Sequence, residues 1–174
     1  MCLFSNFSCH TNSHNRKHTF AQQANTINTT SQIKKGTRLS VKVIAIADGD
    51  TFHGLTEDKE DIRFRIYGID APEKNQAFGN RSKQYLSNLI FGQIVVIKVQ
   101  NKSDRYGRPI VWVYTPDDKD VSAEMLKAGM AWHYKKYDST PEYAEYEIEA
   151  RKAKLGLWVD NNPVAPWDFR KNKK

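Results

Sequence analysis

Three short polar clusters carry the side chains that could do chemistry, and each lies at the end of an apolar segment. They are Asp48-Gly49-Asp50-Thr51, then Arg65 followed by Gly68-Ile69-Asp70-Ala71-Pro72-Glu73, and finally Asp104-Arg105-Tyr106-Gly107-Arg108. Together they supply carboxylates and arginines at the places where strands are expected to turn.

These residue types meet the needs of phosphodiester hydrolysis. The scissile phosphate gains negative charge as water attacks, and a hard divalent cation with oxygen ligands can neutralise that charge. Arginine binds phosphate oxygens in a bidentate manner, and a carboxylate beside the water can act as its general base. On this basis the metal would be held by Asp50 and Asp70, the phosphate by Arg65 and Arg108, and the water by Glu73.

The spacing between Arg65 and Asp70 sets a structural condition on this site. Residues five apart on an ideal strand face opposite sides of the sheet, but a twist or bulge near Gly68 could bring both into one pocket. The following turn could present the Asp70 carboxylate, a backbone carbonyl and Glu73 towards one calcium ion. Taken singly, Asp50 would be a turn residue and Arg65 an arginine on a strand face.

The elements that must position these clusters can be predicted from apolar periodicity and turn residues. Strands are expected at 39–47, 51–55, 62–69, 93–100 and 109–115, and helices at 80–91, 121–128 and from about 140 to 155. Five short strands with a helix between the third and fourth are typical of an OB-type barrel, here with antiparallel closure. The predicted fold class is therefore α+β, mainly a five-stranded barrel with three helices.

The chain divides into a body and two polar ends. Residues 1–36 are rich in Asn, Ser, Thr, Gln and His, which favours a disordered tail or a processed leader. We expect the folded domain at 37–160 and a basic tail at 161–174. The net charge is +7, but nine of the 27 Lys and Arg residues lie in 1–38 and 170–174. The remaining 18 stand against 20 acidic residues in 39–169, so charge alone does not indicate nucleic-acid binding by the body.

The two cysteines, Cys2 and Cys9, both lie in the N-terminal segment, which excludes a disulfide or a cysteine metal site in the body. If the true start lies upstream, Cys9 could be the lipidated residue of a lipoprotein leader; otherwise it is a tail cysteine without a role. No apolar run is long enough to span a membrane. A secreted or cell-envelope monomer is the expectation.

The three clusters in this order and spacing resemble the staphylococcal nuclease (thermonuclease) family. The DGDT, RxxGIDAPE and DRYGR segments carry the resemblance, together with Lys154-Leu155-Gly156-Leu157-Trp158, over about residues 39–160. Any one of these motifs is weak, but all of them on a matching strand order are specific.

The resemblance implies a calcium-dependent nuclease that cuts DNA and RNA and leaves 3′-phosphate and 5′-hydroxyl ends. It implies calcium ligation by Asp50, Asp70 and the Ala71 backbone carbonyl, and catalysis by Arg65, Glu73 and Arg108. The type enzyme has threonine where this chain has Ala71, so a side-chain hydroxyl is missing there. Tyr106 and Tyr134 are expected to contact the substrate, because aromatic faces stack on bases.

Two other functions fit parts of the pattern. The same fold occurs as a non-catalytic binding module that has lost the acidic and arginine positions, whereas all five positions are filled here. A plain OB-type binder of single strands would rely on aromatic side chains and tail charge.

Overall fold

A closed five-stranded barrel forms the body of the protein in the computed structural model, which describes residues 33–101 and 103–172. The barrel order is β1-β2-β3-β6-β5, with strands β1 (Arg38–Asp48), β2 (Thr51–Leu55), β3 (Asp61–Ile66), β5 (Ile94–Asn101) and β6 (Ile110–Tyr114). This architecture confirms the predicted OB-type α+β fold. The cysteines, and the leader or lipid anchor expected there, lie outside the described residues.

Alternating side chains build the barrel core, as expected for strands with one face inward. In β5 the side chains of Val95, Ile97 and Val99 are fully buried, whereas Ile94 and Val96, on the alternate face of the strand, are exposed. Phe52 of β2 stacks on the next strand's aromatic ring, Phe64, with 5.4 Å between ring centroids. The core is therefore a packed apolar interior, and the polar clusters are left at strand ends.

The closure of the barrel differs from the expected antiparallel pattern. Strands β3 and β6 pair in parallel, with Arg65 opposite Ile110 and Ile66 opposite Val111. The other barrel pairings are antiparallel. The parallel pair arises because the chain passes through a helix and β5 between these strands, so β6 returns in the direction of β3.

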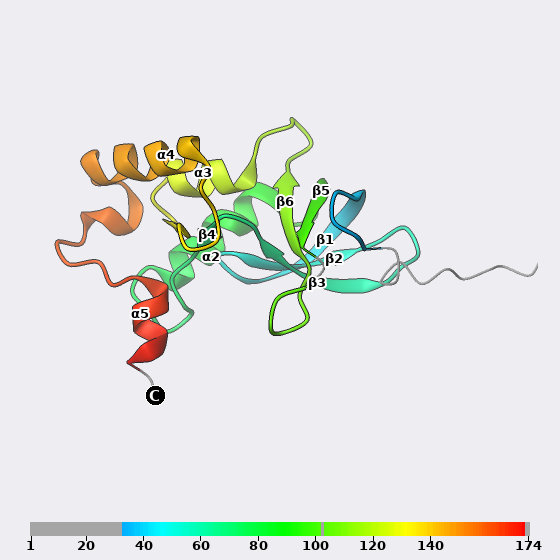
Figure 1. Cartoon of the computed structure of the whole chain (residues 1–174), viewed down its shortest axis with the longest axis horizontal. Coiled ribbons are helices and arrows are strands. Elements are labelled where there is room, and N and C mark those ends of the chain that lie inside the picture. The colour runs from blue at the N-terminus through cyan, green and yellow to red at the C-terminus, as the bar shows by residue number, and fades with distance from the viewer. Residues whose placement is uncertain (1–32, 102, 173–174) are drawn as a thin grey trace, which may run out of the picture.

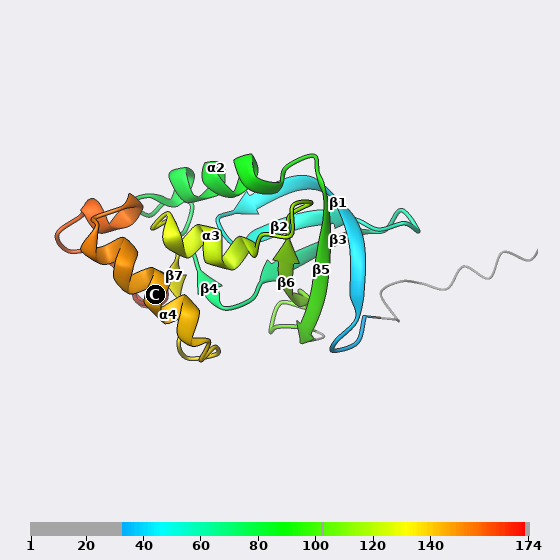
Figure 2. The ribbon, with the colours of Figure 1, turned by 90° about the horizontal axis from the view of Figure 1, so that it is seen from above.

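Helices gather at one end of the barrel (Figures 1 and 2). They are α2 (Gly79–Ile90), α3 (Val121–Lys127), α4 (Pro141–Lys152) and α5 (Pro166–Lys171), with a 3-10 turn, η1, at Gly156–Val159. Helix α2 buries Leu86 and Ile90 in the barrel core. Asp120 caps the start of helix α3, and its carboxylate accepts hydrogen bonds from the first-turn amides of Ser122 and Ala123. No helix among the described residues is long and apolar enough to cross a membrane.

The third predicted strand, 62–69, is in fact two strands. β3 ends at Ile66, and a two-residue strand, β4 (Ile69–Asp70), pairs with β7 (Trp132–His133) instead of with the barrel. The break lies at Gly68, whose φ of 79° favours glycine. A side chain there would also meet Tyr143, since an ideal Cβ would lie 2.6 Å from its ring.

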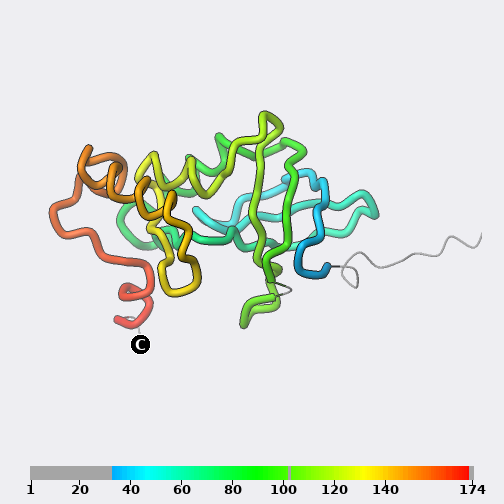
Figure 3. Tube along the Cα trace, turned by 45° about the horizontal axis from the view of Figure 1, so that its top comes forward, coloured from blue at the N-terminus to red at the C-terminus, as the bar shows by residue number. Residues whose placement is uncertain are grey.

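Both ends of the described chain pack more closely than expected. Ile33, which lies before the predicted start of the domain at 37, is only 2% exposed and belongs to the core. At the other end, α5 lies within the segment expected as a basic tail. Figure 3 shows this last part of the trace returning below the helices before it ends.

Candidate active site

Arg65 joins the two aspartates that were predicted to bind metal. Its Nη2 lies 3.1 Å from Asp50 Oδ2 and donates a hydrogen bond of 3.1 Å to Asp70 Oδ1. The same nitrogen donates to the Ile69 carbonyl, and Nη1 donates to the Ile66 carbonyl. All three charged side chains are nearly buried, with exposed fractions of 11%, 8% and 2% for Arg65, Asp50 and Asp70.

Two glycines let the backbone make this arrangement. The strand break at Gly68 turns Asp70 back towards Arg65, at the residue where a twist or bulge was expected to bring the two together. Gly49, between β1 and β2, packs directly on α2: an ideal Cβ there would lie 1.9 Å from Ser82 Oγ. This close approach brings Asp50 beside the β4 segment, where its Oδ2 accepts a 2.7 Å hydrogen bond from the Ala71 amide.

Arg108 is oriented by its own loop and linked to Asp50 through a hydroxyl. Its Nε and Nη2 both donate to Asp104 Oδ2, at 2.9 and 2.7 Å. Its Nη1 donates to Thr51 Oγ1 at 3.0 Å, and this hydroxyl donates in turn to Asp50 Oδ1. Asp104 therefore orients Arg108. Thr51 belongs to the first polar cluster, but no role in this link was predicted for it.

Glu73 reaches the aspartates through an arginine that sequence reasoning missed. Arg170 Nη1 donates to Glu73 Oε1 at 2.8 Å, and Arg170 Nη2 donates to Asp70 Oδ2 at 2.7 Å. The Glu73 side chain is 39% exposed, in contrast to the buried aspartates. The five predicted residues thus lie in one hydrogen-bonded network, completed by Thr51 and Arg170.

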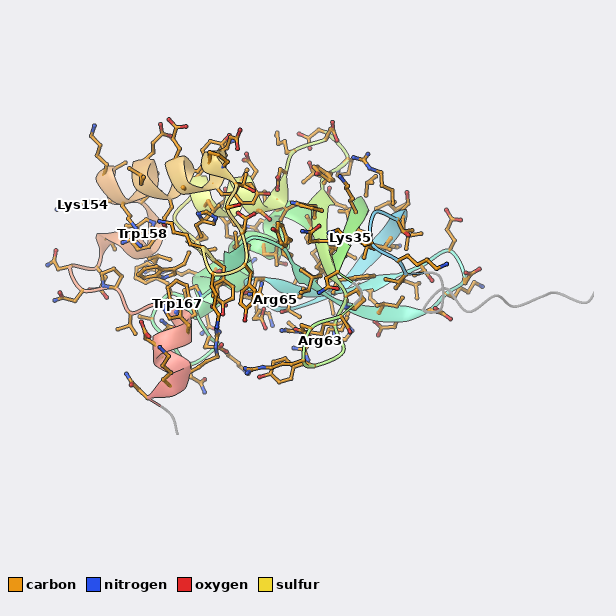
Figure 4. All side chains as sticks on the ribbon, viewed as in Figure 1. Lys35, Arg63, Arg65, Lys154, Trp158 and Trp167 are labelled. Carbon is orange, nitrogen blue, oxygen red and sulfur yellow. The ribbon has the colours of Figure 1, made fainter. Side chains whose placement is uncertain are left out.

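This network lines a pocket of about 1380 Å³ whose rim is basic. Although residues 39–169 carry a small excess of acids, Lys and Arg side chains collect around the opening: Lys35, Arg63, Arg105, Lys135, Lys136 and Lys171. Figure 4 shows Lys35 and Arg63 on the barrel side of Arg65, and Trp167 on the side of α5. A basic rim around an acidic centre suits a polyanion that must approach a bound cation.

Comparisons with known proteins agree with this geometry. The family model described as staphylococcal nuclease homologue matches residues 63–160. The chain belongs to the staphylococcal nuclease family. It is 42% identical to an "uncharacterized endonuclease" of Haemophilus influenzae over 133 residues, 76% of this chain and 74% of that protein. It is 41% identical to a "micrococcal nuclease" of Shigella flexneri over 143 residues, 76% of this chain and 81% of that protein.

Family membership makes this protein a nuclease, a phosphodiester hydrolase with a nucleic-acid substrate. The enzyme is therefore favoured over the non-catalytic binding module that the sequence left open. The matched segment contains the second and third polar clusters but ends before α5. Arg170 and Trp167 thus come from outside the part of the chain that the family model describes.

The donor set of the acidic centre fits a hard cation. Burial raises the pKa of Asp70, and the negative charge of Asp50 raises it further, although hydrogen bonds from Arg170 oppose both effects. A cation between the two carboxylates would relieve this repulsion. No group of three or more acidic, histidine or cysteine side chains arranged for a metal occurs in residues 33–101 and 103–172. The protein would therefore supply two carboxylates and a backbone carbonyl, and water the remaining ligands of a calcium ion.

The two tyrosines expected to contact substrate lie at different depths. Tyr106 is 66% exposed on the rim, with Arg108 Cζ 5.3 Å from its ring centroid. Tyr134 is half-buried, and its ring stacks parallel on Trp167 with 5.4 Å between centroids. Burial raises the pKa of Tyr134, and the nearby charge of Asp70 adds to this shift. The Arg105 guanidinium also lies over the Tyr106 ring, with Cζ 4.7 Å from the ring centroid. Tyr106 therefore has arginines as partners, whereas Tyr134 has an aromatic one.

Asp48 provides a test of the electrostatics beside the site. Burial and the adjacent charge of Asp50 raise the pKa of Asp48 from 3.8 to about 7. The native state therefore binds this proton more tightly than the unfolded state, so the free energy of unfolding falls as pH rises from 3.8 to about 7. We expect Asp48→Asn to raise the melting temperature at pH 8 in chelator and to change it little at pH 4.

Thermal denaturation of wild type and Asp48→Asn across this pH range checks the expectation. The exposed Glu57→Gln, in the β2–β3 turn, is the matched control. At pH 8, a melting temperature of Asp48→Asn equal to or below that of the wild type would contradict the raised pKa of Asp48.

Proposed function

We propose that this protein is a calcium-dependent, sugar-non-specific nuclease that hydrolyses DNA and RNA to 3′-phosphate and 5′-hydroxyl ends. The observation that supports it best is the convergence of Asp50, Asp70, Glu73, Arg65 and Arg108 in one pocket. The calcium requirement and the product ends rest on the family resemblance and on the donor chemistry of the two buried aspartates.

In this proposal the carboxylates of Asp50 and Asp70 hold the ion. Bound there, calcium would neutralise charge that develops on the phosphate during attack. Thr51 and the Ala71 amide fix the two oxygens of Asp50, so the carboxylate does not need to reorganise when a cation arrives. Preorganised donors of this kind are the usual source of electrostatic stabilisation in enzymes.

Glu73 is the group suited to the water. Its carboxylate is more exposed than those of the aspartates, yet it is held beside them by Arg170. It can accept a proton from an incoming water molecule as general base. Because Glu73 lies three residues after Asp70, where β4 ends, its backbone position is set by the same strand that presents Asp70.

The two arginines would bind the phosphate from different elements. Arg108 has two nitrogens on Asp104 and one on Thr51, which orients its guanidinium plane at the pocket wall. Arg65 is shared between the aspartates, so phosphate would compete with Asp50 and Asp70 for its donors. Cation binding by the aspartates would lower that competition, which makes ion and substrate binding mutually supportive.

The proposal is tested by incubating the protein with plasmid DNA and with RNA, with calcium or with EDTA. We expect both polymers to be degraded in calcium, degradation to stop in EDTA, and added calcium to restore it. Labelled oligonucleotides then show the chemical nature of the new ends. Continued cleavage in EDTA would remove calcium from the mechanism, and degradation of only one polymer would refute the lack of sugar specificity.

A further inference from the structure

Helix α5 brings a third arginine into the acidic centre from outside the segment that the family model matches. Arg170 donates to both oxygens of Asp70, with Nη1 3.2 Å from Oδ1 and Nη2 2.7 Å from Oδ2. It also donates to Glu73 at 2.8 Å. One guanidinium therefore bridges the residue proposed to hold the cation and the residue proposed to activate water.

Contacts within α5 and just before it fix the position of the helix beside the turn that carries Asp70 and Glu73. Trp167 stacks on Tyr134 and meets Trp132 edge-on, with 5.5 Å between the latter ring centroids. Just before the helix, the Val164 carbonyl accepts a 2.6 Å hydrogen bond from Gln76 Nε2. These contacts place Arg170 by packing, and its side chain is 35% exposed. The packing of α5 thus supports the contact of Arg170 with Asp70 and Glu73.

The charges in the network show what Arg170 can do. Asp50, Asp70 and Glu73 contribute three carboxylates, and Arg65 and Arg170 contribute two guanidinium groups that contact them. Asp70 has each of its oxygens within hydrogen-bond distance of an arginine nitrogen. A divalent ion at Asp70 therefore meets a positive group that already holds the same carboxylate, and this lowers its affinity.

We propose that Arg170 is a positioning residue of the active site, which holds Glu73 beside Asp70 and weakens cation binding there. The inference rests on the proposed nuclease function. The planar fork of arginine orients two carboxylates at once, which a lysine ammonium cannot do with the same geometry. Substitution by lysine therefore keeps the charge of Arg170 but loses its geometry, whereas substitution by glutamine removes the charge.

The experiment compares Arg170→Gln, Arg170→Lys and Lys127→Gln. Lys127 is the matched control, because it is an exposed cation that pairs with an acid of its own helix, Glu124, and it does not line the pocket. Calcium binding is measured by calorimetry, and kcat and KM are measured on a DNA oligonucleotide in saturating calcium. Circular dichroism verifies that each variant is folded.

We expect Arg170→Gln to bind calcium about 3- to 30-fold more tightly, since a unit charge near the ion is removed. Its kcat should fall about 10- to 100-fold with KM unchanged, as for loss of a residue that orients a catalytic group. Arg170→Lys should keep the calcium affinity of the wild type but also lose kcat. Lys127→Gln should match the wild type in both measurements.

Several results would overturn the inference. Arg170→Gln with unchanged or weaker calcium binding, or with kcat within twofold of wild type, would leave Arg170 a structural residue only. Equal calcium affinities for the Gln and Lys variants would show that its charge does not matter. If the wild type cuts DNA in calcium while Arg170→Gln behaves identically, the positioning role fails and the proposed function stands. A wild type that neither binds calcium nor cuts would refute both.

Discussion

Replacing Glu73 by glutamine should lower the rate of plasmid cleavage about 10²- to 10⁴-fold, the usual contribution of a general base. The amide keeps the shape of the side chain and can still accept a hydrogen bond from Arg170, but it cannot take a proton from water. Since Glu73 is 39% exposed and lies in a loop, the fold should tolerate the change.

The measurement is the initial rate of supercoiled plasmid loss in calcium, at equal concentrations of folded protein. Glu145→Gln, an exposed position on α4, controls for the loss of one negative charge and should cleave like the wild type. A Glu73→Gln variant that retains more than roughly a tenth of the wild-type rate would show that another group activates the water.

Arg65→Ala should lose both activity and stability. The substitution leaves Asp50 and Asp70 buried without the guanidinium that lies between them, and breaking a buried pair in this way costs about 3–5 kcal/mol. We expect cleavage to be undetectable and the chemical denaturation midpoint in EDTA to fall accordingly. Calcium should recover part of the stability, because a cation can compensate the two carboxylates.

Arg63→Ala is the matched control for this change. Arg63 lies two residues earlier on β3, so it faces the same side of the strand, but it is exposed. Its removal should alter the free energy of unfolding by no more than about 0.5 kcal/mol. If Arg65→Ala were as stable as Arg63→Ala in EDTA, the aspartates would not depend on Arg65 for their burial.

Much of the fold and of the site was predictable from local pattern. The alternation in β1 and β5 identifies strands whatever the rest of the chain does, and strands found at those positions confirm it. From the five-residue spacing of Arg65 and Asp70 we expected that a twist or bulge near Gly68 could bring them together, and the strand breaks at that residue. The alternation of apolar residues ends at Ile66, but periodicity could not show that the chain changes sheet there, because only the pairing of β4 with β7 reveals it.

The role of α5 could not be predicted from periodicity. A six-residue helix is too short to show an apolar pattern, and its Arg and Lys residues resemble those of a solvated tail. The signals that were available are Pro166 at the first helical position and Trp167 after it, an aromatic residue that is unusual in a solvated tail. The contact of Arg170 with Asp70 spans 100 residues of sequence and depends on tertiary packing.

The most direct test of the account is a crystal structure of the wild-type protein grown in calcium. It should show one ion between Asp50 and Asp70, with oxygen ligands at about 2.3–2.6 Å that include the Ala71 carbonyl and water. Glu73, Arg65 and Arg108 should line the same pocket. Calcium-soaked crystals with no ion at these carboxylates, or with the ion held by other residues, would contradict the central claim that this pocket is a calcium-assisted phosphodiesterase site.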